Sequence, residues 1–513
     1  MYMTAALHRT LQRHPERPHT IFGTRIRTVA ESADRIARLA GALRSLGVSQ
    51  GSRVGMLGHN SDRYHEYLLA VPWAGAVVNP CNVRWNPDEI SYALRESDTR
   101  WLFVDEVFLA MVPALRARYE GLTTVIYCGD GACPAGMLDY EELIDNSVGI
   151  PDSGRHGDDL FGIFYTGGTT GHPKGVMLSH RNMLTSATGS IATTDFLTRN
   201  GRVLHAAPMF HLGALSGWTA ALLSYCTHVI VPAFSADAVL EAIETHRVND
   251  LRLVPTMMHM LLEHENVSTA NVDSVQHISY GASPISQPLL HRVRERFPSA
   301  RFIQAYGMTE LSPVACMLSP EDHDDPALER SCGLPAAHVE VRIIDEDDKE
   351  LPRGSIGEVA VRGDNVMLGY LNRPADTAAV LRDGWMHTGD AGYMDERGYV
   401  FIVDRIKDMV ITGGENVYSA EVENVLAQQE SVAQCAVIGV PDDKWGERLH
   451  AVVVTRAGAA VTEAQLQGFC RERMAGYKIP RSVAFVDVLP MSAAGKVLKR
   501  LLREQYSLES TQR

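Results

Sequence analysis

Apolar residues recur with two different spacings in the first three hundred residues of the chain. Ile36, Leu39, Leu43 and Leu46 follow the spacing of a helix over residues 30–47, and Gly47 ends the pattern. Short apolar runs alternate with helical segments, and each run has the length of a buried strand: 52–58, 76–80, 99–105, 123–129, 228–233, 250–256 and 274–282. This alternation predicts a mainly parallel sheet covered by helices.

The pattern changes after about residue 330. Residues 338–363 alternate apolar and polar positions between turn clusters, which predicts antiparallel strands, and residues 395–417 continue in strands. The remainder combines a helix at 419–429 with strands at 433–440 and 447–455, enough for a small α+β domain. The polar run Asp404–Lys407 interrupts two apolar strands and indicates a domain boundary.

Length and composition are those of a multidomain globular protein. A chain of 513 residues is too long for one hydrophobic core, and 45% apolar with 21% charged residues is ordinary for a soluble protein. The N-terminal segment lacks the apolar core of a secretory signal. The most apolar stretch, 214–232, contains Ser, Gly, Thr and His and ends at Pro232, so it predicts a buried helix leading into a strand rather than a transmembrane segment. Peripheral membrane contact is left open.

Charge and cysteine content indicate which partners and which cellular compartment to expect. A formal charge of −14 argues against a nucleic-acid partner, which selects a basic surface. The 8 cysteines contain no C-x-x-C pair, which is typical of reduced structural thiols and not of a disulfide frame or a zinc site. We therefore expect a cytoplasmic protein.

Residues 165–176, YTGGTTGHPKGV, form the densest group of glycine, threonine and lysine in the chain. An apolar strand precedes them, the glycines let the backbone approach a ligand, and Lys174 adds a mobile positive charge. The spacing differs from the G-x-x-x-x-G-K-[ST] phosphate loop. The stretch predicts a phosphate-binding loop of another design, and a glycine-rich hairpin without a ligand is the alternative.

Three later segments carry chemistry when taken together. Residues 304–310, QAYGMTE, offer an aromatic face for a purine and a carboxylate for a cation. Asp390 in the segment 387–399 has a carboxylate suited to two ribose hydroxyls, and Lys496 follows a small flexible turn in the segment 489–500. Each has an ordinary alternative, namely packing for the aromatic residue and a solvated charge for the lysine.

The order and spacing of these motifs, with DRIKDMVITGGENVYSAEVE at 404–423, resemble the adenylate-forming superfamily of acyl- and aryl-CoA synthetases, firefly luciferases and peptide-synthetase adenylation domains. The resemblance covers residues from about 10 to about 503. It implies an α/β fold with a large N-terminal domain, 1–404, of two parallel-sheet subdomains plus a small antiparallel β-barrel subdomain at about 331–404. A small, mobile α+β C-terminal domain, 405–513, is implied to turn about a hinge at Lys407.

The resemblance also implies the ATP site. The phosphate loop would consist of Thr166, Gly167, Gly168, Thr169, Thr170, Gly171 and Lys174. The adenine would lie between Tyr306 and the backbone of Gly281, Ala282 and Ser283, with Gly307 beside it. Thr309 would reach the α-phosphate, Glu310 would hold Mg²⁺, and Asp390 and Arg405 would hold the ribose.

Catalysis, by the same resemblance, proceeds in two half-reactions. A carboxylate attacks ATP to give an acyl-adenylate and pyrophosphate, and a thiol, expected to be that of coenzyme A, then takes the acyl group. Catalytic roles fall on Lys496, Glu310, Thr166 and His211, and the CoA contacts on Gly413, Gly414, Trp445 and Lys478, although Trp445 equally fits simple packing. The expected partners are a small carboxylic acid, ATP, Mg²⁺ and CoA; a homodimer is left open.

The acyl pocket is the least determined part of the site. The resemblance assigns to it His211, Gly213, Ala214, Gly281 and Gly307. No Asp occurs from Pro208 to Gly217 to pair a substrate ammonium, which disfavours a free amino acid. We expect a medium- or long-chain fatty acid, with an aromatic or cyclic acid as the alternative. An enzyme loading a carrier-protein thiol, a luciferase and a non-catalytic nucleotide-binding protein are further alternatives.

Overall fold

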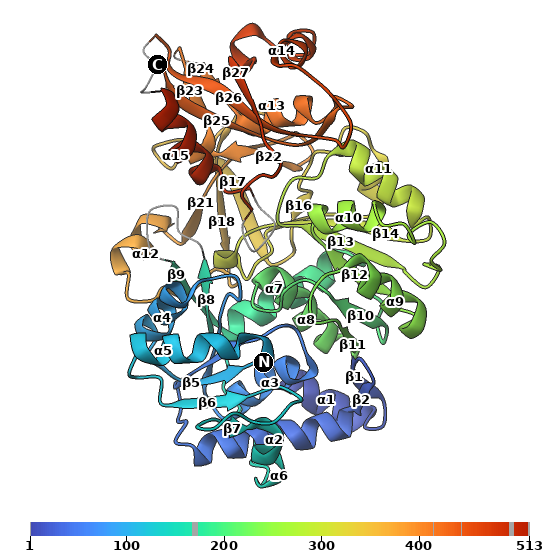
Figure 1. Cartoon of the computed structure of the whole chain (residues 1–513), viewed down its shortest axis with the longest axis vertical. Helices are drawn as coiled ribbons and strands as arrows, with labels where there is room; N and C mark the ends of the chain where they lie inside the picture. The colour runs from blue at the N-terminus through green and yellow to red at the C-terminus, as the bar shows by residue number, and fades with distance from the viewer. Residues whose placement is uncertain (1, 167–172, 414, 443, 492–496, 511–513) are drawn as a thin grey trace.

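The computed structural model of the chain describes residues 2–166, 173–413, 415–442, 444–491 and 497–510 (Figure 1). Two large sheets, here called sheet A and sheet B, form the body of the molecule, and two smaller ones, sheet C and sheet D, follow along the chain. This arrangement confirms the expected mixed α/β fold with parallel-sheet subdomains, a small antiparallel sheet and a separate C-terminal α+β part.

Sheet A consists mainly of residues 200–335. Its strands, in spatial order, are β16 (Leu334–Pro335), β15 (Cys316–Leu318), β14 (Arg301–Tyr306), β13 (His277–Gly281), β12 (Asp250–Leu253), β10 (Arg202–His205), β11 (Thr227–Ile230), β1 (Pro18–Phe22) and β2 (Arg25–Thr28). The strands from β14 to β1 are parallel, while β15, β16 and β2 run antiparallel to their neighbours. The strand predicted over 250–256 ends at Leu253, because Pro255 occupies the first turn of the next helix.

Sheet B is built mainly from the first 180 residues. Its strands, in spatial order, are β19 (Gly369–Tyr370), β9 (Lys174–Ser179), β8 (Leu160–Thr166), β4 (Val77–Pro80), β3 (Arg53–Leu57), β5 (Thr99–Val104), β6 (Thr124–Tyr127) and β7 (Leu138–Asp139). Strand β19 comes from two hundred residues later in the sequence and pairs antiparallel with β9. That pairing brings Tyr370 to the strand that begins with Lys174.

Helices cover the two large sheets, while α13 to α15 accompany sheet D (Figure 1). The helices are α1 (Ala5–Arg13), α2 (Val29–Ser45), α3 (Asp62–Trp73), α4 (Pro87–Glu96), α5 (Val112–Arg118), α6 (Tyr140–Asp145), α7 (His180–Thr193), α8 (Leu212–Leu223), α9 (Ala236–His246), α10 (Pro255–Leu262), α11 (Gln287–Arg296), α12 (Pro374–Val380), α13 (Ser419–Leu426), α14 (Glu463–Arg471) and α15 (Lys499–Ser510). Helix α2 confirms the predicted helix at 30–47, and it begins with a reciprocal capping box between Thr28 and Glu31. The apolar stretch at 214–232 forms α8 and β11, as predicted. No helix in the described part of the chain is long and apolar enough to cross a membrane.

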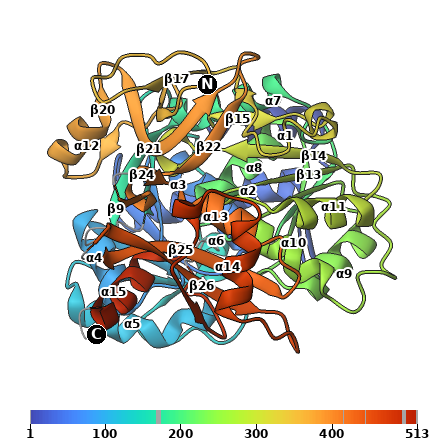
Figure 2. The same ribbon diagram turned by 90° about the horizontal axis from the view of Figure 1, so that it is seen from above.

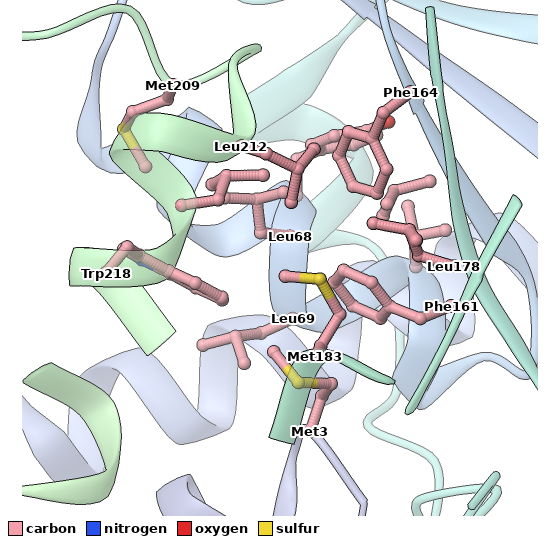
Figure 3. Packing of buried hydrophobic residues seen from close by; sticks show 14 of the residues in the cluster. Met3, Leu68, Leu69, Phe161, Phe164, Leu178, Met183, Met209, Leu212 and Trp218 are labelled. Atoms are coloured by element: carbon pink, nitrogen blue, oxygen red, sulfur yellow. The ribbon is translucent and has the colours of Figure 1, made fainter. Parts of the chain in front are cut away.

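A shared hydrophobic core holds the two large sheets together (Figure 3). Leu68 and Leu69 of α3 and Phe161 of β8 meet Leu212 and Trp218 of α8 in this core. All five side chains are buried, so α8 is fixed on the side facing sheet B as well as on the side facing sheet A. A rigid α8 matters below because its glycines border the candidate acyl site.

Two antiparallel sheets complete the chain. Sheet C contains β17 (Val339–Ile344), β18 (Gly357–Gly363), β20 (Leu381–Arg382), β21 (Trp385–Met394) and β22 (Val400–Arg405). Sheet D contains β23 (Val410–Thr412), β24 (Glu415–Val417), β25 (Val432–Asp442), β26 (Gly446–Thr455) and β27 (Ser482–Phe485), with β27 parallel to β26. Sheet D and helices α13 to α15 lie together at one end of the molecule, at the top of Figure 1. Seen from above in Figure 2, they lie over the N-terminal part.

All 8 cysteines are free thiols, most of them buried. The absence of disulfides agrees with the interpretation of these residues as structural thiols.

Candidate active site

The first part of the candidate site is a hydrogen-bonded group of Tyr306, Asp390 and Arg405. Tyr306 ends β14 and donates its hydroxyl proton to Asp390 Oδ2 at 2.6 Å. Arg405 Nε lies 2.5 Å from Asp390 Oδ1, and the two residues are backbone partners on β22 and β21. Burial, and then the Asp390 carboxylate, raise the pKa of Tyr306 well above its usual value, so its phenol stays a neutral donor. The geometry thus places a buried, fixed carboxylate beside an aromatic ring.

Glycines shape the neighbouring strand ends. A Cβ on Gly281, the last residue of β13, would lie 2.2 Å from the Ala305 carbonyl oxygen, and one on Gly307 would lie 1.8 Å from that of Pro313. Neither position tolerates a side chain. Between them in space, Ala282 has a left-handed backbone with φ of +69° and is exposed, and Ser283 is half-buried. These residues lie at the carboxyl ends of adjacent parallel strands, the usual position of a ligand crevice in α/β proteins.

The second part of the site connects Glu310 to Lys174 through Tyr370. Glu310, in a single turn of 3-10 helix that starts at Thr309, is buried and accepts a hydrogen bond from the Tyr370 hydroxyl at 2.9 Å. Lys174 Nζ lies 5.0 Å from the centre of the Tyr370 ring and 3.3 Å from Asp376 Oδ2. Burial and the Glu310 carboxylate raise the pKa of Tyr370. A carboxylate and an ammonium group therefore face the same tyrosine.

The loop between Lys174 and Thr166 is only partly described. Thr166 ends β8 and pairs across the hairpin with Lys174, which begins β9. The predicted loop residues Gly167, Gly168, Thr169, Thr170 and Gly171 lie outside the described residues, and so do Gly414 and the predicted catalytic Lys496.

Tyr370 and Asp376 are site residues that the sequence patterns missed. The only local signal for Tyr370 is its place between a glycine and the turn-forming Asn372–Pro374. Nothing local relates it to Glu310, sixty positions earlier, because the two are brought together by tertiary contacts: β19 pairs with β9, and the Met367 N–H donates to the Glu310 carbonyl at 2.9 Å.

The candidate acyl site lies beside the first two turns of α8. His211 stands at the helix N-cap, half-buried, with its ring 4.2 Å from that of Phe210. A Cβ on Gly213 would meet no atom within 4 Å, and one on Gly217 would first meet Arg252 Cδ at 3.2 Å. Ala214 is buried in the packing of the helix. Gly213 therefore leaves open space along one side of α8, whereas the Arg252 side chain fills the space beside Gly217.

The predicted CoA residues have partners within the C-terminal part. Gly413 has φ of +63°, its N–H donates to the Trp445 carbonyl at 2.8 Å, and a Cβ there would lie 2.7 Å from the Trp445 ring. Trp445 thus packs directly on Gly413. Lys478 forms an ion pair with Glu421 at 2.7 Å and is only partly exposed.

The link between sheets C and D contains the expected hinge. Lys407 is exposed in a short 3-10 turn, Ile406–Asp408, between β22 and β23. Asp404, at the end of β22, accepts hydrogen bonds from the N–H and hydroxyl of Ser419 at 2.5 and 2.6 Å. Ser419 is the first residue of α13, so a residue on the sheet C side caps a helix on the sheet D side.

Two features meet at the carboxyl ends of the parallel strands. One is a buried carboxylate beside an aromatic ring, and the other is a second carboxylate with a lysine near a glycine-rich hairpin. Together they are typical of the adenylate-forming class of enzymes. The chain belongs to the family of AMP-binding enzymes: residues 7–371 match the model of the AMP-binding enzyme, and residues 421–496 match the AMP-binding enzyme C-terminal domain. Its relatives are acid–thiol ligases of the AMP-forming type.

The sequence relatives include a feruloyl-CoA synthase of an Amycolatopsis species, 40% identical over 93% of this chain and 94% of the relative. An indoleacetate–CoA ligase of Aromatoleum aromaticum is 36% identical over 94% of each chain. The medium/long-chain-fatty-acid–CoA ligase FadD8 of Mycobacterium tuberculosis is 32% identical over 97% of this chain and 88% of its own.

Solved structures of the same fold carry the ligands of both stages of adenylation. The ATP-bound MatB of Rhodopseudomonas palustris superposes with a TM-score of 0.90, at 31% identity and 99% coverage of both chains. The o-succinylbenzoate CoA synthetase of Bacillus subtilis, bound to its acyl-adenylate, gives 0.85 at 32% identity, covering 98% of this chain and 97% of its own.

Proposed function

We propose that this chain is an ATP-dependent CoA ligase that activates a carboxylic acid as an acyl-adenylate and transfers the acyl group to the thiol of coenzyme A. One observation carries the proposal: the Tyr306–Asp390–Arg405 group and the Glu310–Tyr370–Lys174 group lie next to each other, since Glu310 follows Tyr306 by only four residues. The first suits a nucleoside and the second suits a charged phosphate chain.

The adenylation step brings two anions together. A carboxylate oxygen attacks the α-phosphorus of ATP, and the bond to the β-phosphate oxygen breaks, so that pyrophosphate leaves with the added charge. No proton has to be removed from the acid, so positioning and positive charge supply the catalysis. Lys174 is the positively charged group of this hairpin among the described residues, and Lys496 would supply a second charge at the α-phosphate.

Glu310 fits a magnesium ion. Mg²⁺ binds through one or two carboxylates together with substrate phosphates, and it stabilises the charge of the leaving pyrophosphate. No cluster of three or more potential metal ligands occurs among the described residues, which accords with an ion held jointly by Glu310 and the nucleotide. The Tyr370 hydroxyl orients the Glu310 carboxylate for this role.

The second step requires the site to admit a thiol. The thiolate attacks the acyl carbonyl carbon, AMP leaves, and the thiol proton passes to solvent. We assign residues 1–404 to the adenylating domain and 405–513 to a C-terminal domain that turns about Lys407 between the steps. Gly413, Gly414 and Trp445 would then border the path of the CoA arm.

The acid is proposed to have an aromatic or cyclic body. Support comes from the feruloyl and indoleacetate ligases, which share more sequence with this chain than the fatty-acid ligase does. The open space beside Gly213 accommodates part of such a body. A medium- or long-chain fatty acid is the second candidate, supported by the match to the fatty-acid ligase over nearly the whole chain.

Pyrophosphate release measured over a panel of acids tests the proposal. The panel runs from acetate to palmitate and includes benzoate, cinnamate and indoleacetate, each with and without CoA. We expect release with the aromatic acids and AMP formation that depends on CoA. Release without any CoA dependence would instead favour an enzyme that loads a carrier-protein thiol, and no release with any acid would contradict the proposed function.

A further inference from the structure

Arg252 lies beneath α8, on the sheet A face that borders the candidate acyl site. It is the third residue of β12 and the register partner of Ser279 on β13. Gly281 follows two positions later on β13 and therefore points to the same face. At about 3.3 Å per residue, Arg252 lies roughly 7 Å deeper than Gly281 from the carboxyl edge of the sheet.

Helix α8 runs from that edge inward, because it follows β10 and returns the chain to the parallel strand β11. Gly213 is therefore near the edge and Gly217 lies one turn deeper, where its nearest side-chain neighbour is Arg252. These two glycines are half-exposed, whereas the residues around them on α8 are buried. Arg252 keeps part of its surface exposed, although most of its side chain is buried.

The Arg252 guanidinium has no ion pair or hydrogen bond within the described ranges. The acid on its own strand, Asp250, is already engaged by the N–H and hydroxyl of Thr198 and by His277 Nδ1 at 2.8–3.0 Å. On the neighbouring strand β10, the His205 ring is hydrogen-bonded to His228. Burial lowers the pKa of Arg252 to about 10, which leaves the side chain positively charged at neutral pH.

Other deeply placed arginines of this protein have carboxylate partners. Arg35 pairs with Glu66 and Glu141, and Arg63 pairs with Glu141. A buried charge without a partner costs folding free energy, and such charges are normally paired. Arg252 departs from this rule, and it packs against Gly217, one helical turn from the open space beside Gly213.

We propose that Arg252 binds the far end of the substrate acid and selects acids whose body ends in a hydrogen-bond-accepting oxygen, namely a second carboxylate, a ketone or a phenol. The inference rests on the proposed function, since it assigns one end of the acid to the adenylation site. The planar fork of a guanidinium suits such oxygens, because two N–H groups point in parallel at one acceptor group. An acid as short as acetate does not reach this depth.

Matched pairs of acids test the proposal. Each pair shares one carbon skeleton with and without the distal oxygen: cinnamate and para-hydroxycinnamate, octanoate and octanedioate, cyclohexanepropionate and its ring-ketone derivative. We expect the native protein to prefer the oxygen-bearing member by at least about 10-fold in kcat/KM for pyrophosphate release. The three pairs also distinguish which oxygen group is preferred.

Arg252→Leu is expected to remove that preference. The KM for the oxygen-bearing acid should rise about 10- to 100-fold, with a smaller change in kcat, because Arg252 acts far from the reacting carboxylate. The KM of the plain acid should fall, since the added leucine is apolar. Arg252→Lys keeps the charge but not the fork and is expected to retain part of the preference.

Arg202→Leu is the matched control. Arg202 is the first residue of β10, so it lies at the amino ends of the parallel strands of sheet A, opposite the carboxyl ends that border the candidate site. Its guanidinium donates a hydrogen bond to the His246 carbonyl. Its loss measures the general effect of removing an arginine from sheet A, and the preference between paired acids should not change.

Two results would overturn the role of Arg252: no preference in the native protein, or an equal loss for both members of each pair in Arg252→Leu. Calorimetric titration of the paired acids, without ATP, gives a second readout that does not need turnover. If Arg252→Leu fails to fold, Arg252→Lys and the native preference decide. Absence of turnover with every acid would contradict the proposed function, while the titration would still test Arg252.

Discussion

On the candidate nucleotide side of the site, single side chains are held by hydrogen bonds. One substitution can remove such a bond and leave the rest of the side chain in place. Tyr306→Phe deletes the hydroxyl that donates to Asp390 and keeps the aromatic ring. A hydrogen bond to a charged group contributes about 1.5–3 kcal/mol, and part of that orients the carboxylate for its ligand. We expect the KM for ATP to rise about 10-fold, measured by pyrophosphate release.

Tyr393→Phe is the control for this change. Tyr393 lies on the same strand as Asp390, stacks on Phe401 at 4.7 Å, and has no hydroxyl hydrogen bond among the described residues. Its substitution should leave the KM for ATP unchanged. An unaltered KM in Tyr306→Phe would remove the Tyr306–Asp390 pair from the nucleotide site.

Four buried histidines, His19, His65, His205 and His228, form a cluster under α8 next to Trp218. Burial lowers the pKa of His19 to about 4 and that of His205 to about 3, and it holds the pKa values of His65 and His228 well below the ordinary value. The unfolded chain therefore binds more protons below about pH 6.5. Stability conferred by the neutral rings is complete above that pH and is lost as the pH falls toward 4.

His19→Phe tests this pH dependence. Between about pH 6.5 and about pH 4, each such histidine contributes a slope of about 1.4 kcal/mol per pH unit to the free energy of unfolding. Denaturant unfolding across this range should show a slope smaller by about that amount in the variant. An identical slope in both proteins would show that the His19 ring is not kept neutral by burial.

At the scale of elements, the sequence predicted local structure well and distant pairing poorly. The helix at 30–47 and the strand at 52–58 that follows it were predictable, because helical spacing and the stop at Gly47 are local signals. Strands β1 and β2 were missed, since His19 and Thr20 look polar until they pair with β11. In the same way, Arg252 appeared in the sequence as one residue of an apolar strand. Only the tertiary structure reveals that no Asp or Glu side chain among the described residues pairs with it.

Helix α8 is proposed to limit the size of the acid that fits. A Cβ added at Gly213 meets no atom within 4 Å, so the fold should tolerate Gly213→Leu. The leucine side chain would fill the open space beside Gly213, here called the recess. We expect kcat/KM for cinnamate to fall about 10- to 100-fold with little change for the smallest acids. The activity panel and a thermal melt together measure both effects, and equal losses for large and small acids would argue against a recess at Gly213.

The capping of α13 by Asp404 connects sheet C to the C-terminal part across the hinge proposed at Lys407. Asp404→Ala removes the acceptor of the Ser419 N–H and hydroxyl and should cost about 0.5–2 kcal/mol of local stability. Hydrogen exchange in α13 is expected to accelerate relative to α14. Unchanged exchange in α13 would mean that the helix does not depend on this contact.

For the whole molecule, the feature to test is the proposal that the C-terminal domain supplies different residues to the two half-reactions. Motif order in the sequence predicted both the fold and the family, whereas the catalytic role of Lys496 remains a proposal to be tested by experiment. Lys496→Ala should nearly abolish formation of the acyl-adenylate, yet leave transfer to CoA from supplied acyl-AMP largely intact. Separate assays of the two half-reactions measure this. A similar loss in both would contradict a lysine used in only one step.

Sheet A also has a consequence for how the protein is made. Strand β1 finds its parallel partner in β11, about two hundred residues later in the chain. At about 5–20 residues per second, the ribosome delivers that partner roughly 10–40 s after β1 itself. Throughout that interval β1 can pair only with the adjacent β2, so the other edge of this hairpin stays unpaired and open to chaperones and to neighbouring nascent chains.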